Sequence, residues 1–204
     1  VYTNMAIMLQ EVKRLDEAIL YYDKGISIRE DLYYGKGRKE EAPGLANLYS
    51  SKATLLFETW TDPEVGIELC RKSIEILEPH LSGKDVLDTH RMYAMSYSNL
   101  ASGMLRMNAN DPEAWKISDK ALELLRDLVI KQRNHQFFET LSNCLLERVE
   151  HFLSTGKSDC ANEARTELLY SLNESRQKKP SSFLDDVWKN ATERLKQLKF
   201  LPPA

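Results

Sequence analysis

The sequence has little glycine, proline and cysteine. Only 8 Gly and 7 Pro occur in 204 residues, which are too few turn-forming residues for an all-β fold of many short strands. The three cysteines, Cys70, Cys144 and Cys160, are an odd number without a close pair. Free thiols of this kind are typical of a reducing compartment rather than of a disulfide framework. We therefore expect a cytoplasmic protein without disulfide bonds.

Long apolar runs and an excess of charge of one sign are also missing. No run approaches the ~18 apolar residues that a membrane span needs, and no secretory signal is present. The net charge of −3 implies no general attraction for nucleic acid or anionic membranes. We expect a protein or peptide as partner, with no nucleic acid and no membrane. Because an apolar pattern is already under way at Met5, we also expect the chain to be a piece of a longer protein.

Recognisable catalytic and cofactor motifs are missing as well. The four histidines are scattered, none of them forms an HExxH pair, and no CxxC pattern accompanies them, so the sequence indicates no metal site. No GxSxG elbow occurs. The segment from Gly35 to Lys39 lacks the length and the closing Lys-Ser/Thr of a phosphate-binding loop. We therefore expect no enzyme activity, no cofactor and no metal.

One short segment recurs three times at a constant spacing. Its copies begin at Lys24, Lys72 and Lys120, which are 48 residues apart each time. Each copy places a small residue directly after the lysine, followed by apolar residues in a helical pattern. A segment that returns at constant spacing indicates a structural repeat. We therefore expect a stack of similar units.

Apolar residues at helical spacing, separated by short breaks, run through most of the sequence. No segment has the pattern of a strand. Two helices joined by a few residues must lie antiparallel, so we expect an all-α fold of helical hairpins in a single domain, residues 1–204. The predicted hairpins are at about residues 2–34, 43–79, 86–133 and 136–175, and a capping helix follows at about residues 182–199.

Small residues mark equivalent places in these hairpins. The first-helix anchors are Ala6, Ala53, Ala101 and Val149, and the second-helix anchors are Ala18, Gly66, Ala114 and Ala161. Successive anchors are 47 or 48 residues apart. Small residues allow paired helices to approach closely, whereas larger ones would force the pair apart.

The first and third hairpins resemble the tetratricopeptide repeat. The pattern is carried by Tyr2, Met5, Ala6, Leu9, Ala18, Tyr22 and Gly25, and again by Tyr97, Leu100, Ala101, Met104, Ala114, Ser118 and Ala121. The period of about 48 residues is longer than the family's 34. The resemblance implies a right-handed α-solenoid whose first helices line a concave, partner-binding groove.

The resemblance also implies which side chains line that groove. In this family the residue after the small anchor points into the groove, together with the residues four and seven positions before it. The predicted lining is Thr3, Ile7, Asn47, Ser50, Thr54, Ser98, Ser102, Arg106, Asn143, Leu146 and Glu150, with Asn4 and Asn99 beside it. Short polar side chains of this kind can hydrogen-bond an extended peptide or approach a helix closely.

The leading interpretation is a non-catalytic protein–protein interaction scaffold within a larger intracellular protein. It would bind a peptide or a helix of its partner in the concave groove. Two alternatives remain open. In the first alternative, the chain would be a self-association module, in which exposed faces of the terminal hairpins stack on a second copy. In the second, it would be a peptide-sensing or small-ligand-sensing domain that regulates a neighbouring effector domain. The convex face is the alternative location for partner binding.

Overall fold

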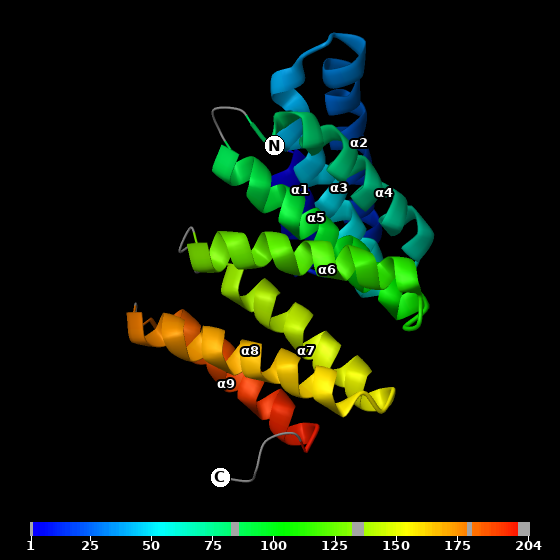
Figure 1. Ribbon diagram of the computed structural model, residues 1–204. Coiled ribbons are helices and arrows are strands. Elements are labelled where there is room, and N and C mark those ends of the chain that lie inside the picture. The colour runs from blue at the N-terminus through cyan, green and yellow to red at the C-terminus, as the bar shows by residue number, and fades with distance from the viewer. Residues whose placement is uncertain (1, 83–85, 132–136, 179–180, 200–204) are drawn as a thin grey trace. The chain divides into compact units, whose positions relative to one another are not determined.

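The computed structural model of the chain describes residues 2–82, 86–131, 137–178 and 181–199 (Figure 1). Within these ranges it contains nine α-helices and no strand. The helices are α1 (Tyr2–Glu11), α2 (Leu15–Glu30), α3 (Ala42–Thr59), α4 (Pro63–Leu77), α5 (Val86–Met107), α6 (Pro112–Arg126), α7 (Phe138–Ser154), α8 (Ser158–Lys178) and α9 (Ser182–Gln197). The predicted all-α fold is confirmed.

The chain divides into two compact units, Val1–Ala121 and Leu122–Ala204. The division falls inside α6. The predicted hairpin boundaries agree with the helices to within a few residues, and the predicted capping helix corresponds to α9. The predicted end of the third hairpin at residue 133 and the start of the fourth at residue 136 lie outside the described residues. The single domain over residues 1–204 stays a prediction.

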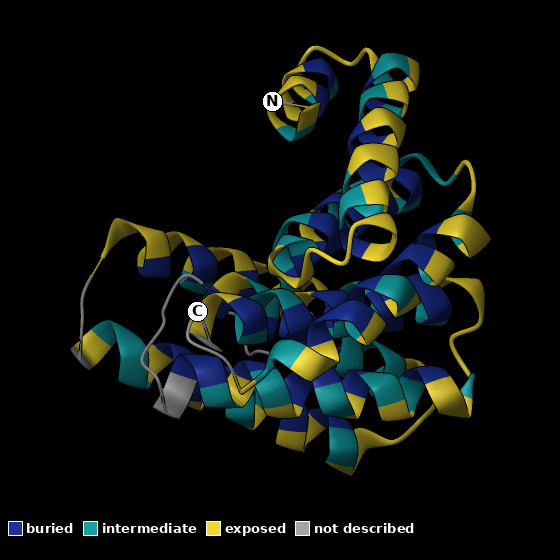
Figure 2. Ribbon diagram, turned by 90° about the horizontal axis from the view of Figure 1, so that it is seen from above, coloured by how far each residue is buried: buried dark blue, intermediate teal, exposed yellow. Residues whose placement is uncertain are grey.

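Helices pack against near neighbours in sequence within each unit. In the first unit α1 packs on α2, α2 on α3, α3 on α4 and α4 on α5, and α3 also contacts α5. In the second unit α7 packs on α8, and α9 contacts both of them. Buried and exposed positions alternate along the helices, so that each has a buried side and an exposed side (Figure 2).

The predicted small anchors lie on the buried sides. Ala6, Ala18, Ala53, Ala114, Val149 and Ala161 are fully buried, Ala101 is 4% exposed, and Gly66 is also buried. Gly66 lies at a close approach of α4 to α3, since a Cβ atom there would meet the Phe57 ring at 2.6 Å. The 48-residue register therefore identifies equivalent buried positions in both units.

The turns within three hairpins use one residue in the left-handed conformation. Lys13, Trp60 and Gly156 have φ angles of 62°, 55° and 73°, and they follow α1, α3 and α7 at equivalent positions. Beside Lys13, Arg14 N–H donates to the Leu9 carbonyl over 2.8 Å, and Lys157 N–H donates to Phe152 in the same way over 2.8 Å. Each of these hydrogen bonds joins an N–H to the carbonyl five residues before it, and it satisfies a carbonyl that has no partner within the last turn of the helix.

The second helices of the first and third hairpins both end in a π-helical turn. These turns are Asp31–Gly35 after α2 and Asp127–Lys131 after α6, so they lie two repeat lengths apart. Both begin with Asp-Leu. In the second hairpin the corresponding turn is a 3-10 helix, Glu78–His80, which contains Pro79. The repeat therefore extends to the backbone geometry at the helix ends.

Candidate interaction surface

The first helix of every hairpin leaves one stripe of side chains open to solvent. We call these residues the open stripe: Asn4, Ile7 and Glu11 on α1; Asn47, Ser51, Thr54 and Glu58 on α3; Met95, Asn99, Ser102 and Arg106 on α5; Asn143, Glu147, Glu150 and Ser154 on α7. Each of them is exposed or half-buried. Because the positions repeat every 47 or 48 residues, the open stripe follows the same register as the buried anchors.

The open stripe contains most of the predicted groove residues but is rotated relative to the prediction. The predicted positions four residues before the stripe centre lie deeper: Ser98 is 7% exposed, Leu146 is 2% exposed, and Thr3 and Ser50 are half-buried. Successive residues of an α-helix are about 100° apart around the helix axis. A residue four positions before the stripe centre is therefore about 40° from it, on the side of the small anchor. A residue three positions before the stripe centre is about 60° from it, on the side away from the anchor. Ser51, three residues before Thr54, therefore belongs to the surface, and so does Met95, seven residues before Ser102. The sequence analysis named neither of them.

Ser50 belongs to a hydroxyl cluster between three helices. Its Oγ lies 3.2 Å from Ser73 Oγ and 3.0 Å from Ser96 Oγ, and the Ser73 and Ser96 hydroxyls are 2.8 Å apart. Ser73 also donates to the Ala46 carbonyl over 3.3 Å, and Ser96 donates to the Met92 carbonyl over 2.9 Å. Since Ser73 and Ser96 are fully buried, the cluster holds α3, α4 and α5 together beneath the open stripe.

Two further hydrogen bonds join the open stripe of α5 to α3. Asn99 Nδ2 donates to Thr54 Oγ1 over 3.1 Å. Arg106 donates to the Phe57 carbonyl over 2.8 Å, and its guanidinium lies 4.1 Å above the centre of the Trp60 ring. These contacts fix the spacing of the two helices and leave Asn47 and Met95 as exposed members of the stripe.

In the second unit, the stripe on α7 is partly occupied by α9. The Glu150 carboxylate accepts two hydrogen bonds from the Arg194 guanidinium, at 2.6 and 3.0 Å. Both side chains are about one third exposed or more, so this pair contributes little to stability. Asn143 remains exposed.

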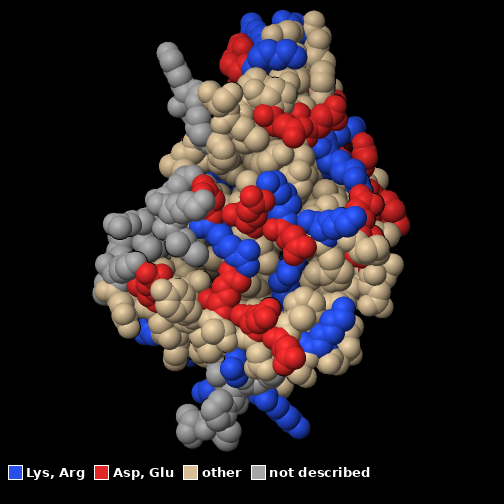
Figure 3. Space-filling model, in the orientation of Figure 1, with Lys and Arg blue, Asp and Glu red and all other residues tan. Residues whose placement is uncertain are grey.

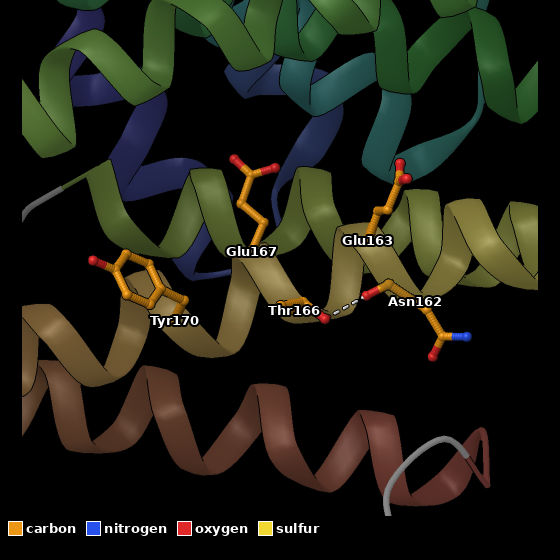
Figure 4. A pocket seen from close by; sticks show the side chains of 5 residues that line it. All are labelled: Asn162, Glu163, Thr166, Glu167 and Tyr170. Atoms are coloured by element: carbon orange, nitrogen blue, oxygen red, sulfur yellow. Dashed lines mark hydrogen bonds between the residues drawn. The ribbon is translucent and has the colours of Figure 1, made fainter.

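An open hollow of about 520 Å³ runs along α8. Its lining residues are Asn162, Glu163, Thr166, Glu167 and Tyr170. Figure 4 shows the Glu163 and Glu167 carboxylates projecting from the same side of α8, with the Asn162 amide turned away from them. Glu167 is paired with the Arg126 guanidinium, and Tyr170 is 66% exposed. A hollow so open to solvent is unlike the enclosed pockets that bury most of a small ligand.

The pKa values of two buried groups and of the half-buried His151 are shifted toward the neutral form. Burial raises the pKa of the Cys70 thiol to about 12. Burial also raises the pKa of Tyr49, as does the 2.5 Å hydrogen bond that its hydroxyl donates to Glu30. Desolvation lowers the pKa of His151, and the nearby charges of Lys157 and Arg148 lower it further. A thiol whose pKa is raised is a poor nucleophile near neutral pH.

The charged surface is mixed in sign. On the face drawn in Figure 3, Lys and Arg side chains interleave with Asp and Glu side chains. Among the residues that the structure describes, no three His, Cys, Asp or Glu side chains are grouped so that they could hold a metal ion. Within the same described ranges, no helix is both long enough and apolar enough to cross a membrane.

The sequence was compared with protein-family models and with curated proteins. No protein-family model matches the sequence, and no curated protein matches it. The resemblance to the tetratricopeptide repeat therefore depends on the residues that carry its pattern.

Proposed function

We propose that the chain is a tetratricopeptide-like interaction scaffold, a right-handed α-solenoid that binds a peptide or a helix of a partner protein along the open stripe. It catalyses no reaction and forms part of a larger intracellular protein. One observation supports this function: the open stripe recurs at equivalent positions on the first helices, while the anchor beside it is buried each time. A surface repeated at constant spacing suits an extended partner that contacts several repeats in succession.

The side chains of the open stripe suit a polypeptide partner. The amides of Asn4 and Asn47 are exposed, and each can donate to a peptide carbonyl and accept from a peptide N–H. Ile7 and Met95 are 43% and 38% exposed and can contact apolar side chains of the partner. We expect the amides to set the register of the bound segment and the apolar pair to contribute most of the affinity.

Binding can be tested with a defined probe. A library of random peptides displayed on phage is selected against the chain, and the enriched peptides are titrated against the parent and two double variants. Asn47→Glu with Met95→Glu places two charges on the open stripe. Ser27→Glu with Val65→Glu introduces the same two charges at exposed positions of the second helices α2 and α4, and it serves as the matched control.

We expect the stripe variant to lose at least tenfold in affinity while the control binds like the parent, since a charge that loses its hydration in a complex is costly. Both variants should keep the helical circular dichroism of the parent. Equal binding by the two variants and the parent would exclude the open stripe as the interface. Selection of no peptide at all would contradict the proposed function itself.

A further inference from the structure

The side of α8 that faces solvent carries an exposed aromatic ring beside the hollow. α8 contacts both α7 and α9, and its buried apolar residues lie together on one side of the helix: Ala161, Ala164, Leu168 and Leu172. Tyr170 lies on the opposite side and is 66% exposed, the largest exposed fraction of any large apolar or aromatic side chain in the described residues. An aromatic ring in this position offers contact area that a partner can cover.

The hollow has an acidic end and an aromatic end. Figure 4 shows Glu163 and Tyr170 toward its opposite ends, with Thr166 between them. Neither the Glu163 carboxylate nor the Tyr170 hydroxyl has a hydrogen bond or an ion pair with any residue that the structure describes. Thr166 Oγ1 donates to the Asn162 carbonyl of its own helix over 2.7 Å, so its hydroxyl proton is already in use. The two ends are therefore the groups that a partner would satisfy, and the short Thr166 leaves room between them.

The neighbouring carboxylate on the same side of α8 already binds a guanidinium. Arg126, at the end of α6, donates from Nε and Nη2 to the two carboxylate oxygens of Glu167, the second bond over 2.6 Å. Both residues belong to the second unit. This two-point geometry is the characteristic one between arginine and a carboxylate. Glu163 projects from the same side one turn earlier (Figure 4), so the chain itself shows which chemistry suits a carboxylate in this row.

The spacing of Glu163 and Tyr170 fits a helix lying along α8. The two residues are seven positions apart, which is about 10.5 Å along the helix axis and about 20° around it. A second helix beside α8 would present its own residues i and i+7 at the same separation, and helices bound in grooves use anchors at such positions. A hollow that is open along its length suits such a helix better than it suits a small ligand.

We propose that the hollow of α8 is a second docking surface, for an amphipathic helix of a partner protein. That helix places a lysine or an arginine on Glu163 and, seven positions away, an apolar side chain on Tyr170. The partner is basic at this point, because a carboxylate brought beside Glu163 would meet a like charge. The surface shares no residue with the open stripe, so it does not depend on the function proposed for that stripe.

A library of displayed helices tests the proposal. A designed three-helix bundle is displayed on phage with the solvent-facing positions of one helix randomised, and it is selected against the unaltered chain. We expect a group of enriched bundles that bind Glu163→Lys at least tenfold more weakly and carry Lys or Arg seven positions from an apolar residue. Tyr170→Ser should weaken the same bundles. Glu193→Lys makes the same charge change at an exposed position of α9, and this matched control should bind like the parent.

An exchange of charges tests the pairing directly. In a selected bundle, glutamate in place of the basic residue should weaken binding to the parent and restore binding to Glu163→Lys, but not to Glu193→Lys. If no selected bundle distinguishes the parent from Glu163→Lys, the proposal is overturned. It is overturned equally if the bundles that do distinguish them lack the basic residue, or carry it at another spacing from the apolar one.

A measurement on the unaltered chain keeps the test decisive if a variant fails to fold. With ¹⁹F-labelled tyrosine, the Tyr170 resonance is assigned by its loss in Tyr170→Phe, and it should shift when a selected bundle is added. The resonance of Tyr34, a residue that follows α2 and is 58% exposed, should stay fixed. A Tyr170 resonance that does not move on binding would show that the helix docks elsewhere.

Discussion

The Phe57 ring fills the space that a side chain on Gly103 would occupy. A Cβ atom on Gly103 of α5 would lie 2.5 Å from Phe57 Cζ. The same ring also meets Gly66 of α4, where a Cβ atom would lie 2.6 Å from Cε1. Phe57 of α3 thus sets the distance from α3 to both neighbouring helices.

Gly103→Ala is therefore expected to destabilise the fold. Alanine gains about 1 kcal/mol over glycine in helix propensity, but overpacking against an aromatic ring costs about 1–3 kcal/mol. We expect a net loss of about 1 kcal/mol in the free energy of unfolding, measured with urea. In a Phe57→Leu background, which lacks the outer ring atoms, the same substitution should instead stabilise. A loss of the same size in both backgrounds would show that Phe57 is not the obstacle.

Ser73→Ala tests the buried hydroxyl cluster. Ser73 makes contacts to Ser50, Ser96 and the Ala46 carbonyl, and its removal leaves buried polar atoms with fewer partners. We expect a loss of about 1–2 kcal/mol in the free energy of unfolding. Ser27→Ala, at an exposed position of α2, should change it by less than about 0.5 kcal/mol. Equal effects in the two variants would argue against a stabilising role for the cluster.

Two substitutions at the left-handed turn residues should change the stability of the fold in opposite directions. Gly156→Ala adds a Cβ atom at a φ of 73° and should lower stability by about 1 kcal/mol. Lys13→Gly removes one at a φ of 62° and should raise stability by up to about 1 kcal/mol. Thermal unfolding of the two variants beside the parent measures both. Melting temperatures that move in the same direction would contradict this assignment of the turns.

Alkaline pH should destabilise the fold through Cys70. Its pKa is raised to about 12 in the folded chain, whereas a thiol in the unfolded chain has a pKa of about 8.5. The stability that neutral Cys70 contributes is therefore complete below about pH 8.5 and is lost as pH rises toward the folded pKa. The urea midpoint should fall between about pH 8 and about pH 9.5, and it should fall less in Cys70→Ala. Parallel pH profiles for parent and variant would refute this linkage.

The sequence predicts the helices well because its apolar period and its breaks are local signals. The 48-residue spacing, which occurs twice, places Ala6, Ala53 and Ala101 at equivalent buried positions. The breaks in the apolar pattern locate the helix ends to within a few residues. Gly66 is identifiable in the same way, since a small residue recurs there. The solenoid arrangement, its handedness and the partner are not local properties, and all three stay predictions.

The side of each helix that faces solvent is harder to predict, because it depends on how far the neighbouring helices wrap around it. A shift of one residue moved Ser98 into the interior and Ser51 to the surface. The contact of Phe57 with Gly103 was missed for a related reason. Phe57 lies 46 residues before Gly103, and the pairing follows from the spacing of α3 and α5 rather than from any pattern in either helix. The sequence did contain one signal for this contact. Gly103 lies inside a helical pattern without a turn to explain it, and the aromatic Phe57 lies nearly one repeat before it.

The near-neighbour packing of the helices has a consequence for how the chain folds. In the described contacts between α-helices, the two partners are one or two helices apart in sequence, so few of these contacts join distant parts of the sequence. Low contact order is associated with rapid folding. Each hairpin can form as soon as its second helix has been synthesised, and it then provides a surface on which the next helix can condense. We expect the chain to acquire structure progressively from its N-terminus as it emerges from the ribosome.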